Sequence, residues 1–176
     1  MSHDGMTQPP MTDWFLRPAE DSDAESLIRV ISRCFDEYPG CVTDVDGEMP
    51  DLRAIASAYR RVGGAYWVAV WQGDVVGCIG AAGAAARPGL GLGTELHRLY
   101  VDPTARRRGI AQRLVAMVEA YARDQGAAFI ELWSDCRFTD AHRLYERLGY
   151  RRCPGIRILG DRSNTAEYHF DRVILR

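Results

Sequence analysis

Residues 95–111 read ELHRLYVDPTARRRGIA and are the most informative part of the sequence. Residues 94–101 have the apolar and aromatic side chains of a β-strand, and the strand is predicted to end before Pro103. After three arginines, Gly109 opens a segment with apolar residues at helical spacing. A strand that leads through a basic loop into a helix leaves free backbone N–H groups at the helix N-terminus. Such groups favour an anion, for example a pyrophosphate.

The segments on both sides of this stretch alternate between the spacing of helices and the two-residue period of strands. Helices are predicted at residues 22–38, 51–62, 109–126 and 139–148. Strands are predicted at residues 15–18, 65–71, 75–80, 94–101, 129–133, 150–159 and 167–175. Residues 80–93 are rich in glycine and alanine, and we expect them to form a mobile loop. The order of the elements predicts an α/β fold, in which helices pack on a mixed sheet.

The length and composition predict one soluble domain at residues 14–176, after a flexible leader at residues 1–13. Of the 176 residues, 47% are hydrophobic, which suffices for a packed core. No apolar run reaches the roughly 18 residues of a membrane helix, and the start lacks the pattern of a signal peptide. We therefore expect a cytoplasmic protein with no membrane partner. The five cysteines are scattered and predict neither a disulfide framework nor a metal site.

The chain has 22 arginines and no lysine. This excludes enzymes that form a Schiff base through lysine, and it excludes ordinary P-loop nucleotide hydrolases, whose phosphate-binding loop needs a lysine. Any phosphate that the protein binds must be held by arginine side chains, by backbone N–H groups or by a helix N-terminus.

The charges are divided unevenly along the chain. Residues 1–97 hold 7 Arg and 14 acidic residues, whereas residues 98–176 hold 15 Arg and 10 acidic residues. Six acidic residues and no basic residue lie between positions 33 and 53, and three arginines are consecutive at 106–108. This distribution predicts that one part of the protein binds an anion and that another part favours a cation.

Arg106, Gly109 and Ala111 match the (Q/R)-x-x-G-x-(G/A) acetyl-coenzyme A signature of the GNAT acyltransferase superfamily. Residues 141–150, AHRLYERLGY, resemble the A-x-x-x-Y-x-x-x-G-[FY] helix of the same family. The two motifs occur in the family's order, with the expected strand between them, and the chain resembles the family over roughly residues 15–175. The resemblance implies a mostly antiparallel central sheet flanked by helices, acetyl-CoA as the co-substrate and no metal.

The resemblance also implies where acetyl-CoA binds. Leu99 and Val101 would offer main-chain groups to the pantetheine arm. The pyrophosphate would lie on the loop formed by Arg106, Arg107, Arg108, Gly109, Ile110 and Ala111. Strand alternation predicts that Leu99 and Val101 share one face of their strand with Glu95 and His97.

Glu95 and Tyr145 are the catalytic residues that the resemblance implies. Glu95 holds the position of the general base, which must take a proton from an amine with a pKa of about 10. Tyr145 matches the tyrosine that protonates the departing thiolate in many relatives. His97 is an alternative base on the same strand, and His142 and His169 are weaker alternatives.

Phe138 departs from the family pattern. Many relatives have an asparagine at this position, and that asparagine binds the pantetheine arm. We expect Asp135 or Arg137 to compensate.

The resemblance predicts acetyl transfer to a primary amine of a small molecule or peptide, by direct attack in a ternary complex. The acidic residues at 36–51 border the acceptor site in the family and favour a cationic amine, although a solvated loop without function is an alternative. A non-catalytic acyl-CoA-binding regulatory module is a second interpretation. A nucleic-acid-binding protein is a third, against which the acidic total argues. Edge strands near the C-terminus favour a homodimer.

Overall fold

Runs of β-branched and aromatic residues form the strands of the computed structural model, which describes residues 13–174. The strands are β1 (Trp14–Pro18), β2 (Ala65–Trp71), β3 (Asp74–Arg87), β4 (Gly91–Val101), β5 (Phe129–Asp135), β6 (Arg151–Ile158) and β7 (Ala166–Val173). The helices are α1 (Ala24–Phe35), α2 (Ile55–Arg61), α3 (Ile110–Asp124) and α4 (Thr139–Arg147). A 3₁₀ helix at Pro50–Ala54 precedes α2, so the helix predicted from residue 51 begins with a tighter turn. Except for Asp13, the leader predicted at residues 1–13 lies outside the described residues.

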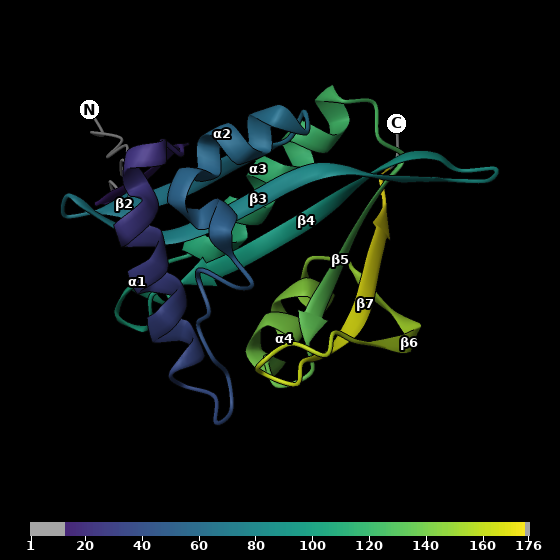
Figure 1. Ribbon diagram of the computed structural model, residues 1–176. Helices are drawn as coiled ribbons and strands as arrows, with labels where there is room; N and C mark the ends of the chain where they lie inside the picture. Colours follow the sequence, from purple (N-terminus) through teal and green to yellow (C-terminus); the bar gives the residue numbers. More distant parts are fainter. Residues whose placement is uncertain (1–12, 175–176) are drawn as a thin grey trace, which may run out of the picture.

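The strands form one sheet in the order β1-β2-β3-β4-β5-β7-β6. Strand β4 pairs with β5 in parallel, and each of the other neighbouring pairs is antiparallel. The predicted fold class, a mixed and mostly antiparallel sheet flanked by helices, is therefore confirmed. The pairing of β4 with β5 runs from Gly93 and Phe129 to Leu96 and Leu132, and beyond it the two strands diverge (Figure 1).

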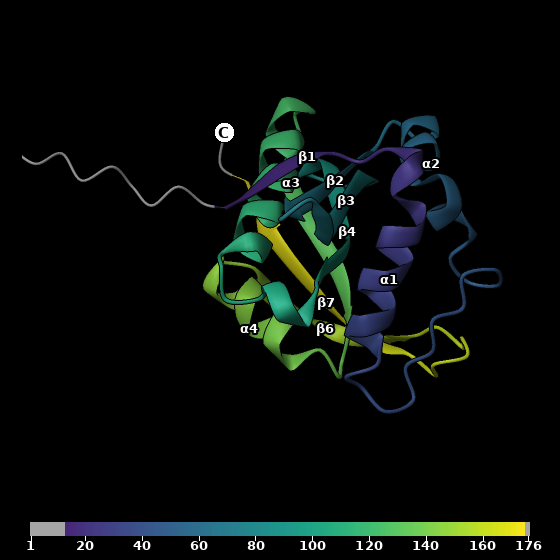
Figure 2. The same cartoon turned by 90° about the vertical axis from the view of Figure 1, so that its left-hand side faces the viewer.

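Helices α1 and α2 cover one face of the sheet, and α3 and α4 cover the other (Figure 2). The first face buries a cluster that includes Leu27, Ile31, Leu52, Ile55, Val68 and Cys78. The second face buries a cluster that includes Leu96, Ile110, Leu114, Val118, Leu132, Tyr145 and Phe170. Burial of these two apolar surfaces is the main favourable contribution to folding. Within residues 13–174, no helix is long and apolar enough to cross a membrane.

The prediction of a mobile loop at residues 80–93 is wrong. These residues continue β3 to Arg87 and begin β4 at Gly91, so that they form the outer half of a long β-hairpin. The glycines at the two ends of this segment are needed for packing: a Cβ atom on Gly80 would lie 2.6 Å from the Tyr59 ring, and one on Gly93 would lie 2.2 Å from the Phe129 ring. The glycine-rich composition led to the prediction of a flexible loop. The sequence does not show that rings from distant parts of the chain fill the space beside two of these glycines.

A β-bulge interrupts β4 at Arg98. His97 pairs with Gly80 and Tyr100 pairs with Cys78, so two residues of β4 lie opposite one residue of β3. Arg98 has a φ of 53°, which is the left-handed conformation. The extra residue changes which side chains share a face, and the predicted alternation over residues 95–101 is wrong. Leu99 and Val101 face the α3 cluster, whereas His97 contacts Tyr59 of α2 on the opposite face.

Candidate active site

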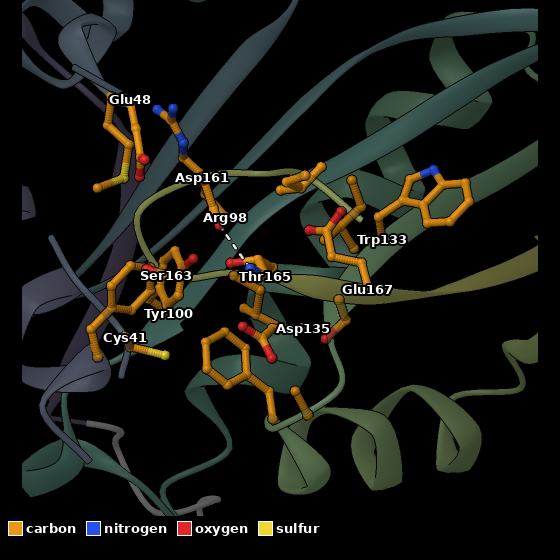
Figure 3. Close-up of a pocket in the computed structure, with 18 of the residues that line it drawn as sticks. Cys41, Glu48, Arg98, Tyr100, Trp133, Asp135, Asp161, Ser163, Thr165 and Glu167 are labelled. Atoms are coloured by element: carbon orange, nitrogen blue, oxygen red, sulfur yellow. Dashed lines mark hydrogen bonds between the residues drawn. The ribbon is translucent and has the colours of Figure 1, made fainter. Parts of the chain in front are cut away.

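A cavity of about 410 Å³ lies where β4 and β5 diverge. Its walls come from both faces of the sheet: Leu99 and Tyr145 line it from the α3 and α4 side, and Met49 and Arg98 line it from the α1 and α2 side. Figure 3 shows that the loop before α2 and the loop between β6 and β7 also surround it, through Glu48 and through Asp161, Ser163 and Thr165. The gap between the strands therefore opens a path through the sheet.

Two further cavities adjoin this central cavity, and Tyr100 lines all three. One, of about 160 Å³, lies beside the start of α3 and is lined by Arg106 and Ala111. The other, of about 660 Å³, lies on the α2 side and is lined by Glu95 and His97. The three cavities together form a cleft that runs from the basic loop to Glu95, although the β4 bulge puts these two ends on opposite faces of the sheet.

The loop between β4 and α3 has the backbone geometry of an anion-binding turn. Arg107 and Gly109 have positive φ angles of 62° and 79°, so the chain turns sharply before α3 begins at Ile110. A Cβ atom on Gly109 would meet no other atom within 4 Å, which shows that the space beside this backbone is open. The first N–H groups of a helix have no partner within the helix, and the helix dipole gives them a partial positive charge. The predicted anion loop thus has free backbone donors at an open surface.

Two of the three arginine side chains of this loop contact other residues of the chain. The Arg106 guanidinium pairs with Glu37 just after α1, and its Nε donates a hydrogen bond to the carbonyl of Val101 at 3.2 Å. The Arg108 guanidinium lies 4.0 Å from the centre of the Trp71 ring. These contacts hold the shape of the loop, so the backbone is better placed than either side chain to bind a phosphate.

Glu95 and His97 lie together on the α2 side of the cleft. The Nε2 atom of His97 lies 3.4 Å from a carboxylate oxygen of Glu95, and the Nδ1 atom of His97 lies 3.1 Å from the Tyr59 hydroxyl. The hydrogen bond from His97 lowers the pKa of Glu95, although partial burial acts in the opposite direction. Glu95 is therefore a carboxylate at neutral pH. Tyr59 was not among the predicted site residues, because helical spacing marked it as a core position and it lies 38 residues from His97.

Tyr145 lies at the other end of the central cavity, on α4. Its ring packs against Tyr150 and Phe170, with ring centres 5.9 and 5.8 Å apart. Burial raises the pKa of the Tyr145 hydroxyl well above the ordinary value of 10, so this group keeps its proton. The structure thus places an ionised carboxylate and a protonated phenol along one cleft.

Arg98 is a second cleft residue that the sequence did not identify. Its guanidinium donates two hydrogen bonds to the Asp51 carboxylate, at 2.6 and 2.9 Å. The β4 bulge turns this arginine toward α2, and the bulge depends on strand pairing that local sequence does not show. The partner lies 47 residues away, in the 3₁₀ helix that precedes α2.

Phe138 forms an apolar wall of the cleft with Tyr38 and Phe35, at ring-centre distances of 4.7 and 6.1 Å. The residues that were expected to compensate for the missing asparagine bind each other, since Arg137 donates to the Asp135 carboxylate through Nε at 2.9 Å and through Nη2 at 2.5 Å. Asp135 lines the central cavity as part of this pair. The cleft is therefore apolar at position 138.

The two remaining candidate bases contact residues other than Glu95 and His97, although the charge of His169 also helps to lower the pKa of Glu95. His142 contacts the Ser134 hydroxyl and the Asp135 carbonyl at 3.2 and 3.0 Å, and burial lowers its pKa. His169 stacks on Trp133 at 4.6 Å and contacts Glu131 at 3.3 Å. In the part of the chain that the structure describes, no group of three or more His, Cys, Asp or Glu side chains is placed to hold a metal ion.

Several carboxylates of the acidic segment 36–51 are paired with arginines. Asp44 pairs with Arg162 at 3.2 Å, and Asp46 pairs with Arg53 at 2.5 Å. Glu48 accepts a hydrogen bond from the backbone N–H of Arg162 at 2.7 Å and lines the central cavity. The acidic segment thus borders the cleft mainly through Glu48 and Asp51.

The sequence is similar to a known protein family and to several of its members. Residues 24–150 match the model of the acetyltransferase (GNAT) family. The N-acetyltransferase YjgM of Escherichia coli is 32% identical over 133 residues, which cover 73% of this chain and 76% of the relative. The N-acetylaspartate synthetase of Danio rerio is 35% identical over 103 residues, which cover 58% of this chain but only 35% of the relative.

Solved structures share the fold. An acetyltransferase from Salmonella typhimurium, solved with acetyl-CoA, superimposes with a TM-score of 0.69 at 16% identity and covers 92% of this chain and 94% of its own. Since the family model spans most of the sequence and the bacterial relative aligns over most of its length, the chain belongs to the GNAT family of acetyltransferases.

Proposed function

We propose that this protein is an N-acetyltransferase that moves an acetyl group from acetyl-CoA to a primary amine, by direct attack in a ternary complex. The observation that carries the proposal is the cleft through the sheet, which joins the anion loop before α3 to the Glu95 carboxylate. Two substrates that enter from opposite faces would meet in the central cavity, beside Tyr145. Membership of the acetyltransferase family supports the same reaction.

The residues of the cleft fit acetyl-CoA. The backbone of residues 106–111 would hold the pyrophosphate, because it combines positive φ angles, open space at Gly109 and the N-terminus of α3. Leu99, Val101 and Ala141 line the adjoining cavity and would lie along the pantetheine arm. When bound, acetyl-CoA supplies the thioester carbonyl that the amine attacks.

The protonation states of Glu95 and Tyr145 suit the two proton transfers of this reaction. A primary amine has a pKa of about 10 and must lose a proton before it can form the new C–N bond. Glu95 would take that proton as general base, since its carboxylate is ionised and lines the cleft. As the C–S bond breaks, Tyr145 would give its proton to the sulfur atom and afterwards regain one from solvent.

The cysteines of the cleft favour direct transfer over an acetyl-cysteine intermediate. A cysteine nucleophile must be a thiolate, which requires a lowered pKa. Burial instead raises the pKa of Cys34 to about 11, and burial also raises the pKa of Cys41. Both thiols therefore keep their protons and are poor nucleophiles.

The charge of the cleft supports a cationic amine as acceptor. Six carboxylates line the central cavity and the cavity on the α2 side, namely Glu48, Asp51, Glu95, Asp135, Asp161 and Glu167. Arg98 and Arg157 line these two cavities too, and both are paired with carboxylates. The excess of negative charge would attract a polyamine, an aminoglycoside-like amine or a basic peptide N-terminus.

An acidic amino acid is a second candidate acceptor. Arg98 uses two of its five N–H groups on Asp51, and the others could bind a substrate carboxylate. One relative is named for N-acetylaspartate.

The cytoplasmic location and the homodimer stay predictions from the sequence.

Two measurements on the full chain test the proposal. Saturating acetyl-CoA should raise the melting temperature by several degrees, since a ligand at about 100 times its Kd adds about 2.7 kcal/mol. Release of free thiol is then followed with a panel of amines ordered by charge, from polyamines through neutral alkylamines to aspartate. Binding of acetyl-CoA without transfer to any amine would indicate the regulatory module, and the absence of binding would refute both interpretations.

A further inference from the structure

Tyr59 contributes a buried hydroxyl to the cleft from helix α2. The residue is only 7% exposed, and its ring packs edge-on against Tyr66, with ring centres 4.9 Å apart. Gly80 makes room for it, since a Cβ atom there would lie 2.6 Å from the Tyr59 hydroxyl oxygen. The ring is therefore held in one place, with its hydroxyl 3.1 Å from Nδ1 of His97.

The contacts of His97 determine which of its ring nitrogens carries the proton. A carboxylate can only accept hydrogen bonds, so the 3.4 Å contact between Nε2 and a Glu95 oxygen favours a proton on Nε2. With the imidazole proton on Nε2, Nδ1 is an acceptor, and the Tyr59 hydroxyl, which burial keeps protonated by raising its pKa well above 10, donates to it. A neutral His97 is thus the Nε2–H tautomer, and both of its nitrogens are engaged. It has no free lone pair with which to take a proton from an amine.

We propose that Tyr59 is a positioning residue that holds His97 in the Nε2–H tautomer and thereby makes Glu95, and not His97, the general base. The proposal rests on the acetyl transfer proposed above. His97 then acts on the reaction through Glu95, because it orients one carboxylate oxygen and leaves the other for the substrate. The proton that Glu95 takes leaves through the open cavity on the α2 side, which Glu95 itself lines.

The tautomer is measured directly by the ¹⁵N chemical shifts of the histidine rings in the full chain, with the His97→Gln variant used to assign the His97 signals. We expect Nδ1 to have the shift of an unprotonated nitrogen and Nε2 that of a protonated one. In Tyr59→Phe the fraction of Nδ1–H tautomer should rise about fivefold, the effect of losing one hydrogen bond. Tyr66→Phe, which removes a buried hydroxyl from the neighbouring ring, is the matched control and should change nothing. A protonated Nδ1 in the native chain, or a tautomer ratio that Tyr59→Phe does not alter, would overturn the proposal.

Activity supplies the second test. The amide of glutamine can donate to Glu95 and accept from Tyr59 as the Nε2–H tautomer does, whereas alanine can do neither. His97→Ala should therefore lose activity, and His97→Gln should restore it to within about tenfold of the native rate. Glu95→Gln should lose about 10²-fold or more, as expected when a general base is removed. If His97→Gln is as inactive as Glu95→Gln, then His97 is the base and the proposal is wrong. If the native chain acetylates no amine, the proposed function fails, while the ¹⁵N spectra still decide whether Tyr59 sets the tautomer.

Discussion

Replacing Gly80 with alanine should both destabilise the protein and slow its reaction. The new Cβ would lie 2.6 Å from Cε1 and from the hydroxyl oxygen of Tyr59, and 2.7 Å from Cζ. Carbon atoms in contact are normally about 3.5–4.0 Å apart, so the ring must move by about 1 Å. Tyr66 packs against this ring and restricts its movement. Any shift that relieves the clash also takes the hydroxyl away from His97.

The magnitude follows from two opposing effects. Overpacking of a core costs about 1–3 kcal/mol, and the loss of backbone freedom in the unfolded chain returns about 0.4–1 kcal/mol when glycine becomes alanine. The net loss of unfolding free energy is then about 1–2 kcal/mol, or about 2–8 °C in melting temperature for a chain of this size. The turnover number should fall as well, because His97 is no longer fixed.

Gly83→Ala is the matched control, since it lies on the same strand and its Cβ would meet no atom within 4 Å. It should leave turnover unchanged and raise the unfolding free energy by up to about 1 kcal/mol. The assays are urea denaturation and the release of thiol from acetyl-CoA. If Gly80→Ala were as stable and as active as Gly83→Ala, the packing of Tyr59 against this strand and its role beside His97 would both be refuted.

Three further predictions concern other parts of the molecule. Gly109→Val should abolish the thermal shift with acetyl-CoA, whereas Gly126→Val, at a similar φ of 68° against 79° but beyond the far end of α3, should cost stability and keep the shift; equal shifts in both variants would contradict the anion loop. Tyr145→Phe should lower turnover by about 10²-fold with acetyl-CoA binding intact, and unchanged turnover would remove Tyr145 from the mechanism. Burial alone would raise the pKa of Asp23, but hydrogen bonds from the Arg17 side chain and a backbone N–H lower it overall. The stabilisation that this carboxylate provides is present above its ordinary pKa of 3.8 and is lost as the pH falls through the lower pKa of the folded state. Asp23→Asn should therefore make the unfolding free energy fall less steeply with acidification, as measured by urea denaturation between pH 5 and pH 2.

Most of the fold was predictable because its elements have strong local signals. The amphipathic spacing of α1 and α3, and the apolar runs of β2 and β5, mark these elements within a few residues. The outer half of the β3–β4 hairpin was missed, since its strands are built from glycine and alanine. Two of the small residues, Gly80 and Gly93, are explained by rings that pack against them, one from α2 and one from β5, and no local pattern reveals such a neighbour.

The amino-acid sequence was sufficient to identify the chemistry of the phosphate end of the cleft. A chain without lysine must bind phosphate through arginine or backbone, and the residues from Arg106 to Ala111 combine a turn-forming glycine with a helix start. The motifs also indicated the family. These features are encoded locally, because the turn, the helix N-terminus and the side chains that shape them lie within a few residues of one another.

The arrangement of the other end of the cleft, around Glu95 and His97, is determined only by the tertiary fold. The bulge at Arg98 moves Leu99 to the face opposite His97, and a bulge is a property of how two strands pair. The pairs Tyr59–His97 and Asp51–Arg98 join residues 38 and 47 positions apart. Which nitrogen of His97 holds a proton, and hence which group is free to act as a base, depends on contacts between distant segments that exist only once α2 packs against the sheet.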